Sequence, residues 1–179
     1  MSLRNGSLPL VVLAFLALPA VVTSLRPAPP EEVAYLAIMA LERRDARALY
    51  DLGSASERSR AGITPLSVSR YLERTLYKEG DVSGLRVVRQ NTVRPNYIQY
   101  MIETERLDLR RNRRHILLSV QQLEGEPFTI ALGELLWNVI EASYPATGPA
   151  MAARVYADLR DETGIRGWYT AADGWRFPE

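Results

Sequence analysis

Tyr97-Ile-Gln-Tyr-Met-Ile-Glu-Thr104 is the stretch that decides the fold, because its apolar side chains recur at every second residue. This period places Ile98, Tyr100 and Ile102 on one face of a β-strand. The stretch His115-Ile-Leu-Leu-Ser-Val-Gln121 repeats the pattern after a polar connection. Two such strands joined by a polar connection predict an antiparallel hairpin.

A third strand is expected before these two. Leu85-Arg-Val-Val-Arg-Gln-Asn-Thr-Val93 is rich in β-branched residues, which favour strands, and Pro95 ends the stretch. The three strands together predict an antiparallel meander.

Helices are expected before the meander. Apolar residues recur at helical spacing from Glu31 to Arg44, and Asp45 can cap a second, short helix. Thr64-Pro65 is a strong start signal for another helix, because a capping residue precedes a proline at the first helical position.

Two more helices and a hairpin are expected after the meander. The helices are predicted over Phe128–Ile140 and Met151–Leu159, and the hairpin turns at Ala172-Asp-Gly174. The order of elements predicts one α+β domain over residues 31–179. Its N-terminal helices pack on an antiparallel sheet, and the additional helices come before the C-terminal hairpin.

An apolar stretch precedes this domain. Leu8–Leu25 contains eighteen residues without a charge, and Arg4 is the one charged side chain before it. This pattern resembles a signal peptide that is cleaved after Ser24. The alternative is an uncleaved anchor helix, since eighteen helical residues reach roughly 27 Å, close to the bilayer core of about 30 Å. A buried core helix is the third alternative, and the first two place the domain outside the cytoplasm.

Closely spaced prolines separate the apolar stretch from the domain. Arg26-Pro-Ala-Pro-Pro30 predicts a stiff, extended linker, because such a composition favours polyproline II. Residues 1–25 are therefore expected to form the signal anchor or cleaved signal peptide, and residues 26–30 the linker.

Composition excludes several classes of function. The 22 basic residues nearly balance the 21 acidic ones, so there is no global electrostatic case for binding nucleic acid. The chain has no cysteine and one histidine, which excludes thiol catalysis, iron–sulfur ligation and the ordinary zinc sites. We expect no cofactor and no metal.

Helices followed by an antiparallel sheet that ends in Asp173-Gly-Trp-Arg-Phe177 resemble the nuclear-transport-factor-two-like superfamily. The resemblance covers Glu31–Glu179 and rests on element order and on these five terminal residues. It implies a cone-shaped domain in which N-terminal helices cross a curved sheet. It also implies a pocket inside the cone, where some members carry catalytic aspartate, histidine or tyrosine.

The residues that would suit catalysis in such a cone are Asp81, Tyr97, Tyr100, Asp108 and His115. None of them has a recognisable partner at an informative spacing. Tyr100 on an apolar strand face is more often a core residue, and His115 follows arginines whose charges disfavour the imidazolium. We therefore predict that the protein is not an enzyme.

Two groups of residues are candidates for partner binding. The densest basic cluster consists of Arg110, Arg111, Arg113 and Arg114. It suits an acidic partner or anionic lipid head groups, unless it is only a solvated hairpin loop. The aromatic candidates, which either anchor an interface or fill the sheet core, are Trp168 and Trp175.

These observations predict one function and two alternatives. We expect a non-catalytic accessory subunit of a larger membrane protein complex, anchored in the cytoplasmic membrane of a bacterium through Leu8–Leu25 with its domain in the periplasm. Its partners would be the lipid bilayer and integral membrane proteins. The alternatives are a small-molecule binding module with a cone-like pocket and an enzyme of that fold.

Overall fold

The structure is a computed structural model that describes residues 27–78, 82–107, 113–143, 148–166, 168–170 and 174–176. Within these residues the chain forms a mixed α+β fold with six α-helices and a four-stranded antiparallel sheet. The α+β class predicted from the sequence is therefore confirmed. The predicted apolar helix over Leu8–Leu25 lies outside the described residues.

Four helices precede the sheet: α1 (Pro30–Glu42), α2 (Ala46–Leu52), α3 (Ala55–Ala61) and α4 (Pro65–Arg74). Two predicted helix starts are confirmed by their caps. The carboxylate of Asp45 accepts the backbone N–H of Ala48 at 2.9 Å, and Thr64 shares a reciprocal capping box with Ser67.

Helix α3 has no counterpart among the predicted elements. Its N-cap is Ser54, whose hydroxyl accepts the backbone N–H of Glu57 at 3.3 Å, and it ends at Gly62 with a φ of +66° that favours glycine. The helix buries only Ala61. Its sequence therefore carries almost no apolar period from which a helix could be predicted.

The four-stranded sheet is a meander of β1 (Arg86–Arg94), β2 (Tyr97–Leu107), β3 (Arg113–Gln122) and β4 (Phe128–Ile130), in the order β1-β2-β3-β4. The predicted meander is confirmed, and so is the alternation that predicted it. On the inner face, three residue pairs of β2 and β3 lie opposite one another and are all buried: Ile98 with Val120, Tyr100 with Leu118, and Ile102 with Ile116.

Strand β4 corrects the helix predicted over Phe128–Ile140. The first three residues of that range pair with β3 as a strand, and the helix, α5 (Leu132–Ser143), begins only after them. A short apolar run has no distinctive period, so the neighbouring strand decides its conformation.

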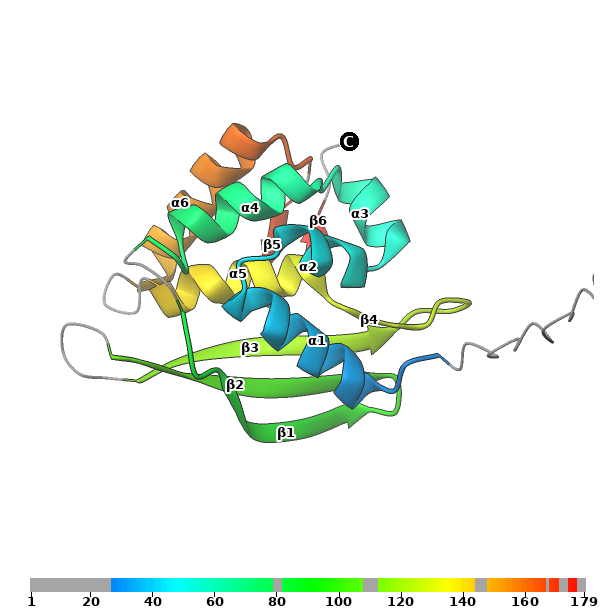
Figure 1. Cartoon of the computed structure of the whole chain (residues 1–179). Helices are drawn as coiled ribbons and strands as arrows, with labels where there is room; N and C mark the ends of the chain where they lie inside the picture. Colours follow the sequence, from blue (N-terminus) through cyan, green and yellow to red (C-terminus); the bar gives the residue numbers. More distant parts are fainter. Residues whose placement is uncertain are drawn as a thin grey trace, which may run out of the picture.

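One edge of the sheet is covered by a helix and the other edge is exposed to solvent. Helix α5 runs along the edge of β3 beyond the short β4, and there the side-chain amide of Asn138 donates to the carbonyl oxygen of Leu117 at 3.0 Å. At the other edge all nine residues of β1 are exposed. Figure 1 shows α1 in front of the sheet, the other helices beyond β3 and β4, and β1 at the opposite border.

Helix α5 is held at its start by a side chain from α3. The carboxylate of Glu57 accepts the backbone N–H groups of Leu132 at 3.0 Å and Gly133 at 2.9 Å. Both groups belong to the first turn, where the N–H groups have no partner inside the helix and the helix dipole favours a negative charge. Glu57 therefore fixes where α5 begins against the sheet.

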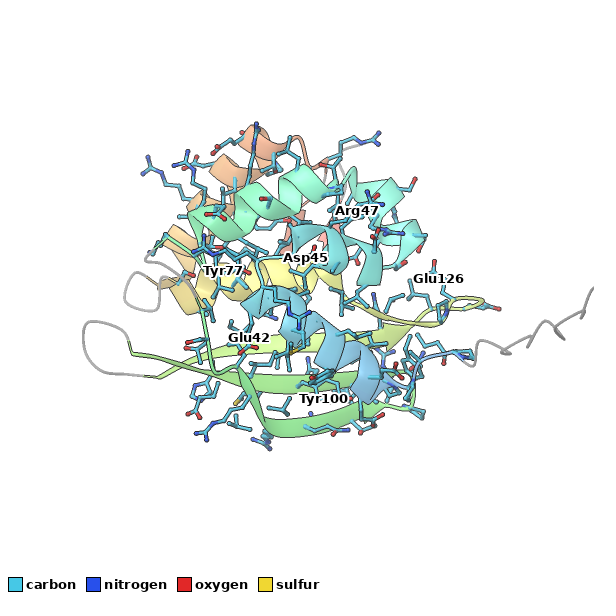
Figure 2. All side chains as sticks on the ribbon, in the orientation of Figure 1. Glu42, Asp45, Arg47, Tyr77, Tyr100 and Glu126 are labelled. Atoms are coloured by element: carbon cyan, nitrogen blue, oxygen red, sulfur yellow. The ribbon has the colours of Figure 1, made fainter. Side chains whose placement is uncertain are left out.

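Two hydrogen bonds link the end of α1 to the segment that connects α4 with β1. The hydroxyl of Tyr77 donates to the carbonyl oxygen of Leu41 at 2.6 Å, and the carboxylate of Glu42 accepts the backbone N–H of Leu85 at 2.8 Å. Figure 2 shows Glu42 and Tyr77 near the end of α1. These bonds fix the start of β1 relative to α1.

Helix α6 (Gly148–Thr163) and the hairpin of β5 (Trp168–Thr170) and β6 (Gly174–Arg176) complete the fold. Gly164 follows α6 with a φ of +73°, which favours glycine, and the predicted C-terminal hairpin is confirmed by the pairing of β5 with β6. Among the described residues, no helix combines the length and the apolar composition that a membrane crossing requires.

We expect Glu57→Ala to lower the free energy of unfolding by about 1–2 kcal/mol, because it removes a charged acceptor from two helix N–H groups. Urea denaturation followed by circular dichroism measures the change. The matched control is Asp158→Ala on the exposed side of α6, which should change the free energy by about 0.5 kcal/mol or less. Equal effects of the two substitutions would contradict the capping role.

Candidate partner-binding surface

The outer face of the sheet is the face opposite the buried Ile98, Tyr100 and Ile102. Because side chains alternate along a strand, the intervening residues lie on it. From β2 these are Tyr97, Gln99, Met101 and Glu103, and from β3 they are His115, Leu117, Ser119 and Gln121. This face is mainly polar at its two ends and apolar at Met101 and Leu117 in its middle.

A row of ionisable residues crosses three strands at one end of the outer face. The register places Arg86 opposite Glu103, and Glu103 opposite His115. The Arg86 guanidinium donates from Nε at 2.9 Å and from Nη2 at 2.6 Å to Glu103 Oε2, while His115 Nε2 lies 3.9 Å from Oε1. Glu103 is buried, but its negative charge is compensated by the guanidinium of Arg86. The row therefore contains no buried charge without a partner.

A second polar cluster ties α5 to the other end of the outer face. The hydroxyl of Tyr97 donates to the carboxylate of Glu134 and lies 3.1 Å from Ser119 Oγ. The amide of Gln99 donates to the same carboxylate at 3.4 Å. Burial raises the pKa of Tyr97, and its bond to Glu134 raises it further. The Tyr97 hydroxyl therefore stays protonated and can donate its hydrogen bond to Glu134, which links β2 to α5.

Strand β1 presents apolar side chains to solvent next to positive charge. Val87, Val88 and Val93 are 44%, 44% and 48% exposed. Within the described residues, Arg89 has no hydrogen bond or ion pair, and the Arg94 guanidinium lies 6.0 Å from the centre of the Tyr97 ring. Exposed valines beside arginine are typical of a contact surface that binds both apolar and acidic groups.

An open groove lies between α1 and α2 and has a volume of about 410 Å³. Its lining residues are Leu36, Met39, Ala40, Arg43, Asp45, Ala48, Asp51 and Leu52. The Asp45 carboxylate is already engaged as the cap of α2. The groove lies on the surface of the helices, and the cone-like pocket implied by the resemblance would lie between helices and sheet.

Only part of the predicted binding residues falls within the described chain. Arg110 and Arg111 lie outside it, and Arg113 and Arg114 are the first two residues of β3. Trp168 belongs to β5, opposite Arg176, and Trp175 belongs to β6, opposite Tyr169. Arg113 and Arg114 therefore belong to a different sheet from the two tryptophans and share no strand with them.

The residues considered for catalysis are dispersed. Tyr100 is 3% exposed, which confirms that it is a core residue, and Figure 2 shows it beside α1. Burial raises its pKa, and the charge of Glu31 raises it further. Asp81 and Asp108 lie outside the described residues. In the part of the chain that the structure describes, no three carboxylate or imidazole groups gather as they would around a metal ion.

Sequence reasoning missed three residues of this surface. Glu103 was visible as a polar residue on the outer face of the predicted β2, opposite the apolar stripe, and Arg89 as a charge in the predicted β1. Glu134 carried no such signal, because its contacts with Tyr97 and Gln99 depend on the placement of α5 beside β3.

Comparison with known proteins found no family model and no curated sequence that matches this chain.

The pair Arg86–Glu103 should show a coupling free energy of about 1 kcal/mol in a double-mutant cycle. The reason is that Glu103 is buried and that two guanidinium N–H groups of Arg86 donate to the same carboxylate oxygen. The cycle compares Arg86→Ala, Glu103→Ala and the double variant by urea denaturation. The exposed pair Arg47–Asp51 is the control and should give about 0.3–0.5 kcal/mol. A coupling at Arg86–Glu103 no larger than the control would show that the row does not stabilise the sheet.

Proposed function

We propose that this protein is a non-catalytic accessory subunit of a membrane protein complex, whose periplasmic domain docks onto other subunits. The observation that carries the proposal is β1, a strand of nine residues that are all exposed, with three valines among them. Solvent-exposed aliphatic side chains grouped on one strand are typical of a protein interface. The docking surface is therefore β1 with the outer-face row Arg86, Glu103 and His115.

The interior of the domain supports docking over enclosure of a ligand. Fully buried side chains from the helices and from the sheet fill the space between them, among them Leu41, Tyr71, Ile102, Leu118 and Leu136. A filled interior makes a stiff body, and a stiff body loses little conformational entropy when it docks.

The direction of the strands gives the arginine cluster a role within this proposal. Figure 1 shows the start of α1 near the β1–β2 turn, while the end of β2 points to the opposite side. Eleven strand residues at about 3.4 Å each place Leu107 and Arg113 roughly 35 Å from that turn. With the N-terminus anchored in a membrane, this end of β2 and β3 would lie on the side of the domain away from the membrane. This geometry favours an acidic protein partner over lipid head groups.

Extraction of native membranes in mild detergent tests the proposed function. We expect the protein to co-migrate with integral membrane subunits, which mass spectrometry then identifies. Intact mass of the extracted protein is measured in the same sample, and the presence of residues 1–24 would support an anchor. A monomer that migrates alone at every detergent concentration would contradict the accessory role, whereas loss of residues 1–24 alone would leave export intact.

One observation favours small-molecule binding as the second candidate function. The Tyr71 hydroxyl and the Trp137 indole N–H are buried without a hydrogen-bond partner, and both rings contact Tyr156, at 6.0 Å and 5.4 Å between centres. A buried polar group without a partner costs about 1–3 kcal/mol. A small polar ligand between α4, α5 and α6 would supply the missing bonds.

The variant Tyr71→Phe tests whether a small molecule binds between α4, α5 and α6. If no ligand binds there, removing the unpaired hydroxyl should raise the free energy of unfolding by about 1 kcal/mol. Thermal denaturation measures this change, and mass spectrometry of an organic extract detects any co-purified small molecule. A destabilised variant, or a compound retained by the wild type and lost from Tyr71→Phe, would favour the binding module.

A further inference from the structure

We propose that β1 binds an extended, acidic segment of a partner protein, which adds to the sheet as a fifth strand. The inference rests on the proposed docking function and specifies the chemistry and the geometry of the partner.

The position of β1 in the sheet provides the backbone groups for such pairing. Only one side of β1 pairs with β2, and an edge strand directs its remaining N–H and C=O groups outward. Among the described residues, no other strand pairs with this outer side. The opposite edge of the sheet differs, because α5 covers it and Asn138 occupies the carbonyl of Leu117. Strand addition is therefore directed to β1.

The register limits where a new strand can pair. Register shifts lie between Val87 and Arg89 and between Thr92 and Arg94. Such irregularities disrupt regular pairing at both ends of β1. The four residues between them, Arg89–Thr92, keep an unbroken register with β2. A partner segment would pair with this central run, and aliphatic side chains at its ends would contact the exposed valines.

The charge of β1 selects an acidic partner. Its sequence, Arg-Val-Val-Arg-Gln-Asn-Thr-Val-Arg, contains three arginines and no acidic residue. Arg86 is bound to Glu103, whereas in the part of the chain that the structure describes Arg89 and Arg94 have no ion-pair partner. Opposite charges directly across two strands are favourable. Glutamate or aspartate alternating with aliphatic residues would therefore match both the charge and the exposed valines.

The same charges disfavour a second copy of this chain as the partner. An antiparallel β1–β1 pair centred on Gln90 would place Arg86 of each copy opposite Arg94 of the other. A parallel pair in register would place every arginine beside its own copy. Like charges directly opposite on neighbouring strands are destabilising, so the preferred partner is a different, acidic chain.

Binding of a synthetic peptide to the full-length protein in detergent micelles tests this inference. The probe is a fluorescent nine-residue peptide of alternating glutamate and valine. A peptide with lysine in place of glutamate is the charge control, and one with the same composition in two blocks is the pattern control. Fluorescence anisotropy measures affinity, and hydrogen exchange locates the protected amides. We expect the alternating acidic peptide to bind at least about tenfold more tightly than either control and to protect backbone amides within the central run Arg89–Thr92.

Two matched charge reversals sharpen the test. Arg89→Glu should weaken binding of the acidic peptide by at least about tenfold, because it places like charges in contact. Arg154→Glu makes the same charge change on the exposed side of α6 and should leave binding unchanged. Circular dichroism checks that both variants fold, and Arg94→Glu replaces Arg89→Glu if the latter does not.

Three results would overturn the inference. They are protection outside β1, equal binding of all three peptides, and a concentration-dependent dimer that Arg89→Glu removes. Co-migration with membrane subunits is measured separately. If co-migration is observed but the peptide does not bind, the proposed fifth strand is contradicted and the proposed accessory role is not.

Discussion

The placement of α5 along β3 is the constraint on which the rest of the structure depends. The apolar side chains of α5 are buried in the core, and two polar contacts fix its position further. Glu57 accepts the first N–H groups of the helix, and Asn138 donates to the carbonyl of Leu117. With α5 in this position, one edge of the sheet is covered and Glu134 reaches the outer face to bind Tyr97. Among the described residues of the four-stranded sheet, the long edge whose backbone groups remain available for a partner is then that of β1.

The contrast between the two edges has an energetic reason. A long uncovered edge strand invites unwanted pairing, and natural proteins limit this with charges and irregular register. Strand β1 has both features, in its arginines and its two register shifts. These features select among partners, since they repel another copy of the strand while they leave a short central run for an acidic segment.

Much of the fold could be predicted from local patterns. Alternation of apolar residues predicted β2 and β3, and capping chemistry predicted the starts of α2 and α4. Helix α3 was missed because it buries only Ala61, and β4 was assigned to a helix because a stretch of three residues is too short to show a period. The partner-binding residues were harder to predict. The arginine cluster was visible in the sequence, but the contact of Glu134 with Tyr97 arises only when α5 packs beside β3.

The central claim is that β1 is the surface by which this protein joins a larger assembly. Site-specific photo-crosslinking in native membranes tests it most directly, with the photoreactive residue at Val88 and, for comparison, at Arg154. Crosslinks from Val88 to a single acidic partner subunit, with none from Arg154, are the predicted result. Equal crosslinking from both positions, or crosslinks from Val88 only to another copy of this chain, would contradict the claim.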